Sequence, residues 1–266
     1  MTMKGRRFRR RLRTMLSVCV ATCLGALDAG AQMEQQARLV EQGQKVYDLH
    51  CVGCHGEKGD GQGPAARLLI VKPRDFTKGV FKFRTTPSGS LPTDEDLYRT
   101  ITRGVFRTSM PEHALLPEKQ RLAVIQYIKT FSDRWQTERS GQPIPIPAPS
   151  EDLGSPESIA RGKAVYELLE CWTCHGRAGR GDGPSAATLQ PDEWGNPQKP
   201  FNFTKGWLKS GPTPRDVYRT FMTGLNGTAM PSYQAIFESP DGENIREGDA
   251  WHLISFVLSL REKQNP

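Results

Sequence analysis

The sequence CVGCHG at residues 51–56 recurs as CWTCHG at residues 171–176. In each copy two cysteines stand three positions apart, and a histidine follows the second cysteine. On a helix, residues at positions i and i+3 lie on one face, so both thiols could face the same planar ring. This spacing is typical of c-type haem attachment, in which the cysteines form two thioethers and the histidine ligates iron.

Two other uses of a Cys-x-x-Cys pair are open at this point. A structural zinc site would have to join Cys51 and Cys54 to Cys171 and Cys174 across 116 intervening residues, whereas zinc ribbons use short spacings. A thioredoxin-like dithiol would require a βαβ context, which the sequence does not show. The sequence therefore favours two covalently bound haem c groups, and it leaves no thiol of these four for a structural disulfide.

Each motif belongs to a longer internal repeat with an offset of 120 residues. The sequence GQGP at 61–64 recurs as GDGP at 181–184. The sequence FTKG at 76–79 recurs at 203–206, where the offset is 127. The second copy therefore has an insertion before that block and an equal deletion after it. The chain is expected to contain two homologous units with loop variation.

The N-terminal segment, residues 1–31, has the pattern of a secretory signal peptide. It contains seven Lys or Arg residues, then a largely apolar run over Met15–Leu27, then small residues ending at Ala31. We expect cleavage after Ala31 and export to the periplasm. An uncleaved N-terminal membrane anchor is the alternative.

Charge and hydropathy exclude two broad classes of protein. Six of the seven net positive charges of the chain lie in residues 1–31, so the basic balance does not indicate a nucleic-acid partner. No apolar stretch approaches the roughly 20 residues that a membrane-spanning helix requires. A polytopic membrane protein is therefore excluded.

The rest of the chain divides at a proline-rich linker, residues 140–150. Domain one is expected over 32–139 and domain two over 151–266. Each is expected to open with a helix that runs into its cysteine motif and to end with another helix. No period-2 strand pattern appears, so the expected fold class is mainly α. The Pro-, Gly- and Thr-rich segments 72–93 and 190–214 are expected to be ordered loops around something other than a protein core.

A second axial ligand should follow each motif. Met110 and Met230 each stand 55 residues after the motif histidine, and a proline follows each. The other histidines, His50, His113 and His252, have no counterpart in the other copy and are expected on the surface or in helix packing. The predicted iron ligands are His55 and Met110 in the first unit and His175 and Met230 in the second.

These motifs resemble the class I-type cytochromes c in tandem, as in bacterial dihaem electron-transfer cytochromes. The resemblance covers nearly all of residues 34–262 and implies two domains, each of a few helices around one covalent haem. It implies that Pro64 and Pro184 offer backbone carbonyls to the motif imidazoles. It also implies that Gly43 and Gly162 let the first and last helices of each domain cross closely.

The expected function is a relay of single electrons between a redox protein donor and acceptor. With histidine and methionine on both irons, no position is open for a small-molecule substrate. A dihaem redox enzyme, peroxidase-like or thiosulfate-oxidising, would instead need one open or readily displaced distal site. A third possibility is a fixed haem subunit of a membrane respiratory complex.

Overall fold

The computed structural model describes residues 30–239 and 244–261, so all but the last two residues of the expected leader lie outside the described residues. The described chain is mainly helical, as expected, and its β pairing is limited to an isolated bridge between Leu208 and Gly211. None of the described helices is long and apolar enough to cross a membrane. In chain order the elements are a helix over 30–50, α2 (Val52–His55), η1 (Ala66–Leu68), α3 (Asp94–Arg103), α4 (Glu118–Lys129), α5 (Arg134–Thr137), α6 (Pro156–Leu168), α7 (Trp172–His175), η2 (Ala186–Thr188), α8 (Pro214–Thr223), α9 (Gln234–Glu238) and α10 (Asp249–Ser259).

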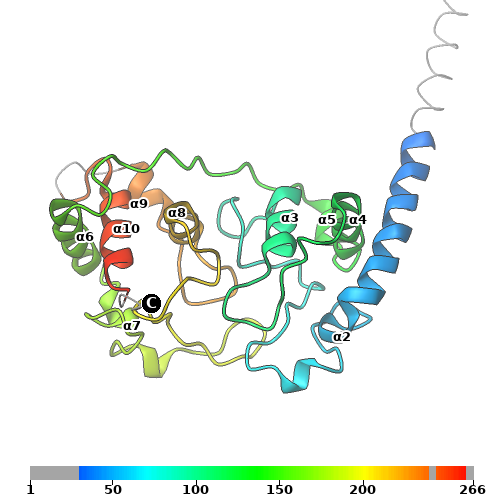
Figure 1. Ribbon diagram of the computed structural model, residues 1–266, viewed down its shortest axis with the longest axis horizontal. Coiled ribbons are helices and arrows are strands. Elements are labelled where there is room, and N and C mark those ends of the chain that lie inside the picture. Colours follow the sequence, from blue (N-terminus) through cyan, green and yellow to red (C-terminus); the bar gives the residue numbers. More distant parts are fainter. Residues whose placement is uncertain (1–29, 240–243, 262–266) are drawn as a thin grey trace, which may run out of the picture.

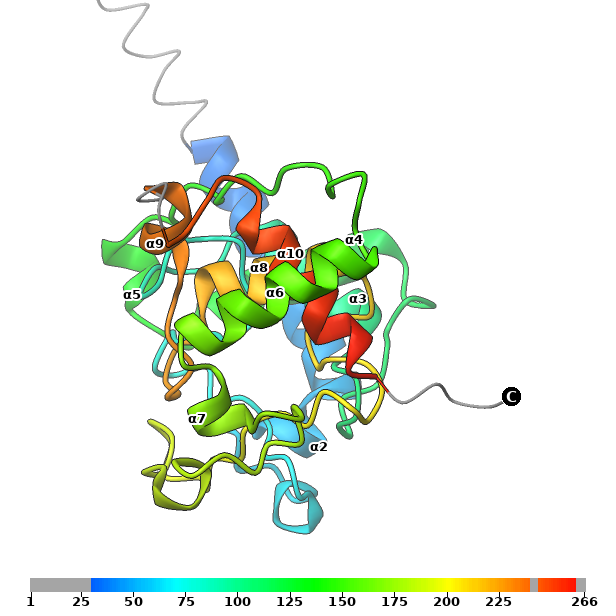
Figure 2. The same ribbon diagram turned by 90° about the vertical axis from the view of Figure 1, so that its left-hand side faces the viewer.

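The proline-rich segment separates two similar groups of elements, which we call the first unit (described residues before 140) and the second unit (described residues after 150). Each unit has a crossed pair of helices at its outer end: the helix over 30–50 with α4, and α6 with α10 (Figure 1). Figure 2 shows α6 lying across α10. Helices α3 and α8 lie between these outer pairs, toward the middle of the molecule. Each unit has its own cluster of buried apolar side chains.

Helices α3 and α8 begin with the same capping box, at the offset of the repeat. The Thr93 hydroxyl accepts a hydrogen bond from the Asp96 amide at 3.1 Å, and the Asp96 carboxylate accepts one from the Thr93 amide at 3.0 Å. Thr213 and Asp216 make the same two bonds at 3.2 and 3.1 Å. These bonds satisfy amides that a helix N-terminus otherwise leaves unpaired, so both helices start at a fixed residue.

The predicted glycine crossings are confirmed in both units. A Cβ atom on Gly43 would overlap the carbonyl oxygen of Ala123 in α4, and one on Gly162 would overlap the carbonyl oxygen of His252 in α10. Only a residue without a side chain lets the two backbones approach this closely. The crossing brings Tyr166 onto Phe256, with ring centroids 5.1 Å apart.

Gly162→Ala should therefore destabilise the second unit, because the added methyl meets rigid backbone of α10 rather than a movable side chain. We expect a loss of at least about 2 kcal/mol in the free energy of unfolding, measured by denaturant titration. Gly53→Ala is the matched control, since Gly53 is helical and exposed and a Cβ there meets nothing within 4 Å. Equal stability of the two variants would contradict the crossing.

The proline-rich segment is attached to both units. The Ile144 amide donates to the Thr85 carbonyl at 2.7 Å, while the Ile144 side chain, 5% exposed, belongs to the apolar cluster of the second unit. The Ile146 carbonyl accepts from Arg215 of α8 at 3.1 Å. The segment has no helix, in agreement with the extended conformation expected from its prolines.

Candidate haem sites

The cysteine motifs form the same short helical turn in both units. Helix α2 contains Cys54 and His55, and the His55 amide donates to the Cys51 carbonyl at 2.9 Å. In α7 the His175 amide donates to the Cys171 carbonyl at the same distance. One helical turn thus separates the two thiols of each motif, as the spacing predicts.

The imidazoles of both motifs are held in one tautomer. The Nδ1 atom of His55 lies 2.9 Å from the carbonyl oxygen of Arg74, and Nδ1 of His175 lies 3.0 Å from that of Phe201. A carbonyl oxygen only accepts, so Nδ1 carries the proton and the lone pair of Nε2 stays available. Burial lowers the pKa of both imidazoles from their usual value, which favours the neutral form. Neutral imidazole with a free Nε2 is the form that ligates a metal.

The carbonyl partners differ from those implied by the family resemblance, which were Pro64 and Pro184. Three backbone bonds place the 61–65 segment against the cysteine turn itself: Gly61 to His55, Gly63 to Cys54 and Ala65 to Gly53. The 181–185 segment makes the equivalent three bonds in the second unit. The next passage of the chain supplies the acceptor instead, because the amides of Phe76 and Phe203 bond to Gly59 and Gly179 and bring residues 74 and 201 beside the imidazoles.

Two aromatic residues per unit complete the support of each motif, and neither was predicted as a site residue. The Phe76 ring lies nearly parallel to the His55 imidazole, with centroids 4.5 Å apart, and Phe203 lies on His175 at the same distance. The hydroxyls of Tyr47 and Tyr166 donate to the carbonyls that follow the two motif histidines, at 2.7 and 2.8 Å. The recurrence of FTKG was the sequence signal for the two phenylalanines.

All four motif cysteines are free thiols, partly buried. Burial, together with the neighbouring Cys54, raises the pKa of Cys51 to about 12, and burial raises that of Cys171 to about 11. Within the described ranges no group of three or more His, Cys, Asp or Glu side chains could hold a metal ion. A zinc site formed by the two pairs of cysteines would be such a group, so the described structure does not support the zinc alternative.

The two methionines lie in turns of identical construction. The carbonyl of Met110 accepts from the Val105 amide and that of Met230 from the Leu225 amide, both at 3.1 Å. The Met110 amide donates to the Thr108 hydroxyl at 3.1 Å, and the second unit repeats this bond at 3.2 Å. Each methionine packs against the apolar cluster that also contacts the first cysteine of its own unit. The motif imidazole stacks on Phe76 or Phe203 of that same cluster, so thiol, imidazole and methionine sulfur all border one apolar cluster in each unit. This donor set fits a covalent haem.

The other three histidines do not repeat between the units. The ring of His113 lies 6.4 Å from that of His50 in edge-to-face geometry, and its buried Nδ1 has no hydrogen-bond partner in the described structure. The residue equivalent to His113 is Tyr233. His252 bonds through Nδ1 to the Ser158 hydroxyl at 2.9 Å, between α6 and α10, which is a helix-packing role.

The loops expected to surround something other than a protein core, 72–93 and 190–214, supply the residues beside the motif imidazoles and also pack against each other where the two units meet. Lys82 forms an ion pair with Asp192 at 3.0 Å, and the guanidinium of Arg74 lies 3.7 Å from the ring centre of Trp194. A cleft of about 640 Å³ also lies at this contact. It is lined by Pro64 but by none of the motif cysteines or histidines, nor by either methionine.

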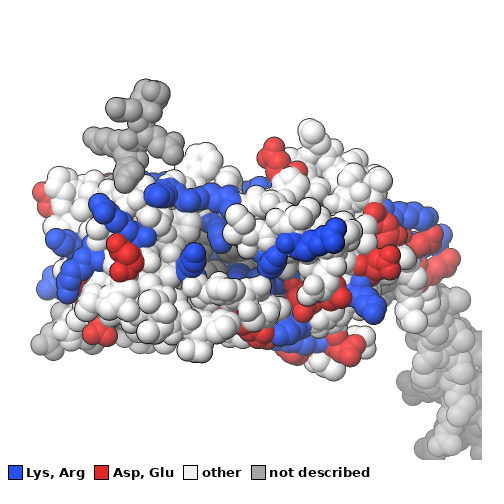
Figure 3. Space-filling model, turned by 90° about the horizontal axis from the view of Figure 1, so that it is seen from below, with Lys and Arg blue, Asp and Glu red and all other residues white. Residues whose placement is uncertain are grey.

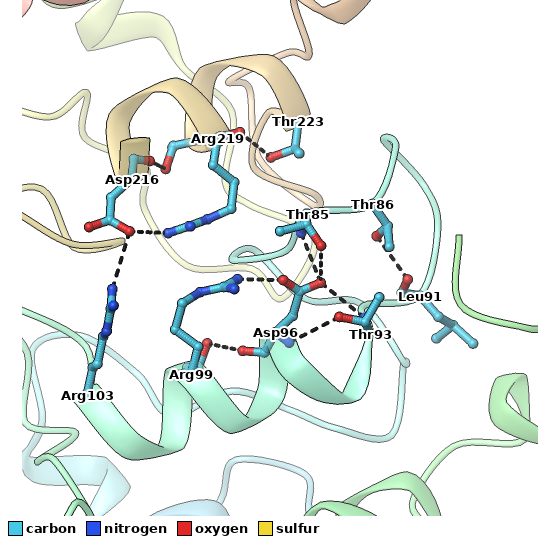
Figure 4. Close-up of polar contacts among 12 residues, drawn as sticks. Thr85, Thr86, Leu91, Thr93, Asp96, Arg99, Arg103, Asp216, Arg219 and Thr223 are labelled. Atoms are coloured by element: carbon cyan, nitrogen blue, oxygen red, sulfur yellow. Dashed lines mark hydrogen bonds and ion pairs between the residues drawn. The ribbon is translucent and has the colours of Figure 1, made fainter. Parts of the chain in front are cut away.

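Helices α3 and α8 also contact each other across the two units, as Figure 4 shows. Arg99 pairs with Asp96 on α3, Arg219 pairs with Asp216 on α8, and Arg103 reaches from α3 to Asp216 at 3.4 Å. Burial raises the pKa of Asp216, but hydrogen bonds from its capping threonine and the charge of Arg219 outweigh this, and the pKa lies below its usual value. The capping carboxylate of α8 therefore stays ionised and holds the two helices together.

Helical domains built around a Cys-x-x-Cys-His turn define the class of c-type cytochromes. The chain belongs to the cytochrome c family, whose model matches residues 40–132 and 159–261. Both predictions, tandem cytochrome c domains and two covalently bound haem c groups, are thereby confirmed. The chain is a c-type cytochrome of electron transport.

One similar protein and one similar solved structure extend this comparison. The cytochrome bc1 complex cytochrome c subunit of Corynebacterium diphtheriae is 26% identical over 211 residues, which are 70% of this chain and 67% of that protein. A chain of the Kuenenia stuttgartiensis reducing HAO-like protein complex is 45% identical, with a TM-score of 0.76. That match covers 84% of this chain and 96% of the other.

Proposed function

We propose that this chain is an exported, periplasmic dihaem cytochrome c that relays single electrons between two redox proteins and has no small-molecule substrate. The observation that carries the proposal is the identical construction of the two methionine turns, which would give both irons a complete set of ligands. The proposed domains are 32–139 and 151–266, joined by the linker 140–150. The proposed thioethers form at Cys51, Cys54, Cys171 and Cys174, and the proposed iron ligands are His55, Met110, His175 and Met230.

When bound, each haem supplies an iron that takes up and gives up one electron. The chain's own residues fix the conditions for that exchange. The carbonyls of Arg74 and Phe201 orient the two imidazoles, and hydrogen-bonded turns hold the backbones of Met110 and Met230. Ligands already held in place need little rearrangement when the charge on the iron changes, which favours rapid electron exchange.

Relay function predicts a specific behaviour of the purified wild-type holoprotein. A reductive titration should take up two electrons per chain, and neither haem should bind carbon monoxide. Added hydrogen peroxide should be consumed no faster than by free haem at the same concentration. Stoichiometric carbon monoxide binding at one haem of the wild type would instead favour the redox-enzyme alternative, because that reading requires an open site.

A second candidate function, that of a fixed haem subunit of a respiratory complex, is favoured by two observations. Both similar proteins are named as parts of complexes. The first unit also exposes three neighbouring apolar residues, Leu68, Ile70 and Val71, whose exposed fractions are 78%, 100% and 37%. The Ala65 amide bonds to the Gly53 carbonyl and places this apolar loop beside the first cysteine motif.

A measurement of the native mass of the extracted protein distinguishes a mobile carrier from a fixed subunit. A carrier should leave gently extracted membranes and run at the mass of one chain. A fixed subunit should stay with its complex in detergent, and Ile70→Asp should release it while both haems are retained. If Ile70→Asp releases nothing from a complex that does form, the apolar loop is not the contact.

A further inference from the structure

Arg84 is a buried cation that reaches from one unit into the other. It lies in the 72–93 loop of the first unit and is 1% exposed. Its guanidinium donates to the carbonyl of Thr223 at 2.6 Å and to that of Gly224 at 3.3 Å, both in the second unit. Its Nε donates to the Pro87 carbonyl of its own loop at 3.3 Å. One side chain thus joins the first unit to the end of α8.

The end of a helix suits a buried cation. Its last carbonyls have no partner within the helix and carry a partial negative charge. Among the described residues Arg84 forms no ion pair, so these carbonyls and the more distant charge of Asp96 compensate its burial. Burial lowers its pKa to about 10, and the charge of Asp96 opposes that shift, so the guanidinium stays charged at neutral pH.

The carbonyls that Arg84 holds begin the turn that carries Met230. Gly224 follows α8 directly, and the Leu225 amide closes the turn onto the Met230 carbonyl. The 72–93 loop of the first unit makes a second contact with the Met230 turn. The Asn226 side-chain oxygen accepts from the Gly89 amide at 3.1 Å and from the Ser88 hydroxyl at 3.2 Å.

The Met110 turn of the first unit is contacted by the second unit in a different way, without a buried cation among the described residues at the end of α3. The part of the loop that contains Arg84 falls in the deletion of the second copy, so no arginine stands at the corresponding place there. In the described structure, Phe106 of the Met110 turn packs against Trp207 in edge-to-face geometry, with ring centroids 5.5 Å apart, and Arg107 donates to the Lys205 carbonyl. No described side chain of the second unit bonds to the last carbonyls of α3.

We propose that Arg84 is a positioning residue for the distal ligand of the second iron. It fixes the end of α8 and the turn after it, so that the sulfur of Met230 is presented in one position. Ligation of the second iron by Met230 then depends on Arg84, which belongs to the first unit. Ligation of the first iron by Met110 does not depend on Arg84. This inference rests on the proposed function, in which Met230 is that ligand.

Arg84→Met tests the inference in the full-length holoprotein, because it keeps an unbranched stem as far as the position of Nε and removes the guanidinium donors. Three charge-assisted hydrogen bonds are lost, two of them to the second unit, so the population of the second haem without its sulfur ligand should rise at least about tenfold. The readouts are carbon monoxide binding to that haem, loss of its sulfur-to-iron absorption and a fall in its reduction potential. The first haem should not change.

Lys82→Met is the matched control. It removes an ion pair between the same two units, Lys82 with Asp192, and leaves in place the bond from the neighbouring Glu193 amide to the Gly227 carbonyl of the Met230 turn. We expect both haems to stay closed to carbon monoxide. Arg84→Lys should rescue part of the effect, since an ammonium can still donate to these carbonyls. Opening of the second haem by Lys82→Met as strongly as by Arg84→Met would overturn the inference, because any loosening of the interface would then suffice.

A milder variant covers the case in which Arg84→Met does not fold. Asn226→Ala removes only the two exposed hydrogen bonds that Ser88 and Gly89 make to the turn. It should open the second haem to carbon monoxide, but less strongly than Arg84→Met does. Met230→Ala tests whether Met230 is the ligand, separately from whether Arg84 positions it. If Met230→Ala leaves the second haem closed, the proposed ligand is wrong. If it opens that haem while Asn226→Ala and every folded Arg84 variant leave it closed, only the role of Arg84 is wrong.

Discussion

Replacing both cysteines of the second motif by serine should remove one covalent haem and leave the second unit largely unfolded. Cys171 and Met230 pack against the buried cluster of that unit, so a haem held between them would contact this cluster and its loss would leave the cluster incompletely packed. The long loops of the unit contribute few buried apolar side chains, so we expect its folding to be coupled to attachment of the haem. The expected effect is therefore the loss of nearly all the folding free energy of the unit.

Two measurements check this result. Intact mass should fall by one haem, and acidic solvent should extract no haem from the wild type, because a thioether bond is covalent. Hydrogen exchange should become fast across α6 and α10 while α4 keeps its protection. The same substitution in the first motif, Cys51 and Cys54 to serine, is the matched control and should reverse the pattern. Retained protection in α10 without its haem would show that the helices fold on protein contacts alone.

The sequence predicted those features of the fold that depend on nearby residues or on steric contact. The cysteine turns and the two terminal helices form as expected because their hydrogen bonds join residues a few positions apart. The glycine crossings form because no other residue fits at Gly43 and Gly162. The partners of the imidazoles could not be predicted in the same way. Any residue can offer a backbone carbonyl, so the carbonyls of Arg74 and Phe201 leave no signature in the sequence.

In the sequence, the contact between the units is visible only as a difference in loop length between the two copies. The copies differ in length at two places, one before the FTKG block and one after it. The extra residues of the second copy include Asp192 and Trp194, and those of the first copy are in the loop that contains Arg84. These residues are among those that join the units. A difference in length shows that a loop has its own role, but it does not show which surface the loop faces.

Substituting either methionine should open an axial coordination position on one iron and leave the other iron fully ligated. Met110→Ala should let the first haem bind carbon monoxide, and Met230→Ala should do the same for the second, because alanine offers no atom that can ligate. Thioether ligation raises the reduction potential. The potential of the affected haem should therefore fall, by on the order of 0.1 V within the roughly 0.8 V that axial ligands span. Spectroelectrochemical titration of each variant measures both haems in one experiment.

His113 supplies the sharpest control for the first haem, because it lies three residues beyond Met110 and its buried Nδ1 has no partner in the described structure. If His113 were the ligand instead, His113→Phe would open the first haem and Met110→Ala would leave it closed. We expect the reverse, since Tyr233 stands at the same place in the second unit while the methionine turn is repeated bond for bond. A double variant, Met110→Ala with Met230→Ala, should bind two carbon monoxide molecules per chain. Binding of only one would mean that one iron keeps a ligand other than methionine, and the complete coordination on which the relay proposal depends would then be wrong for that haem.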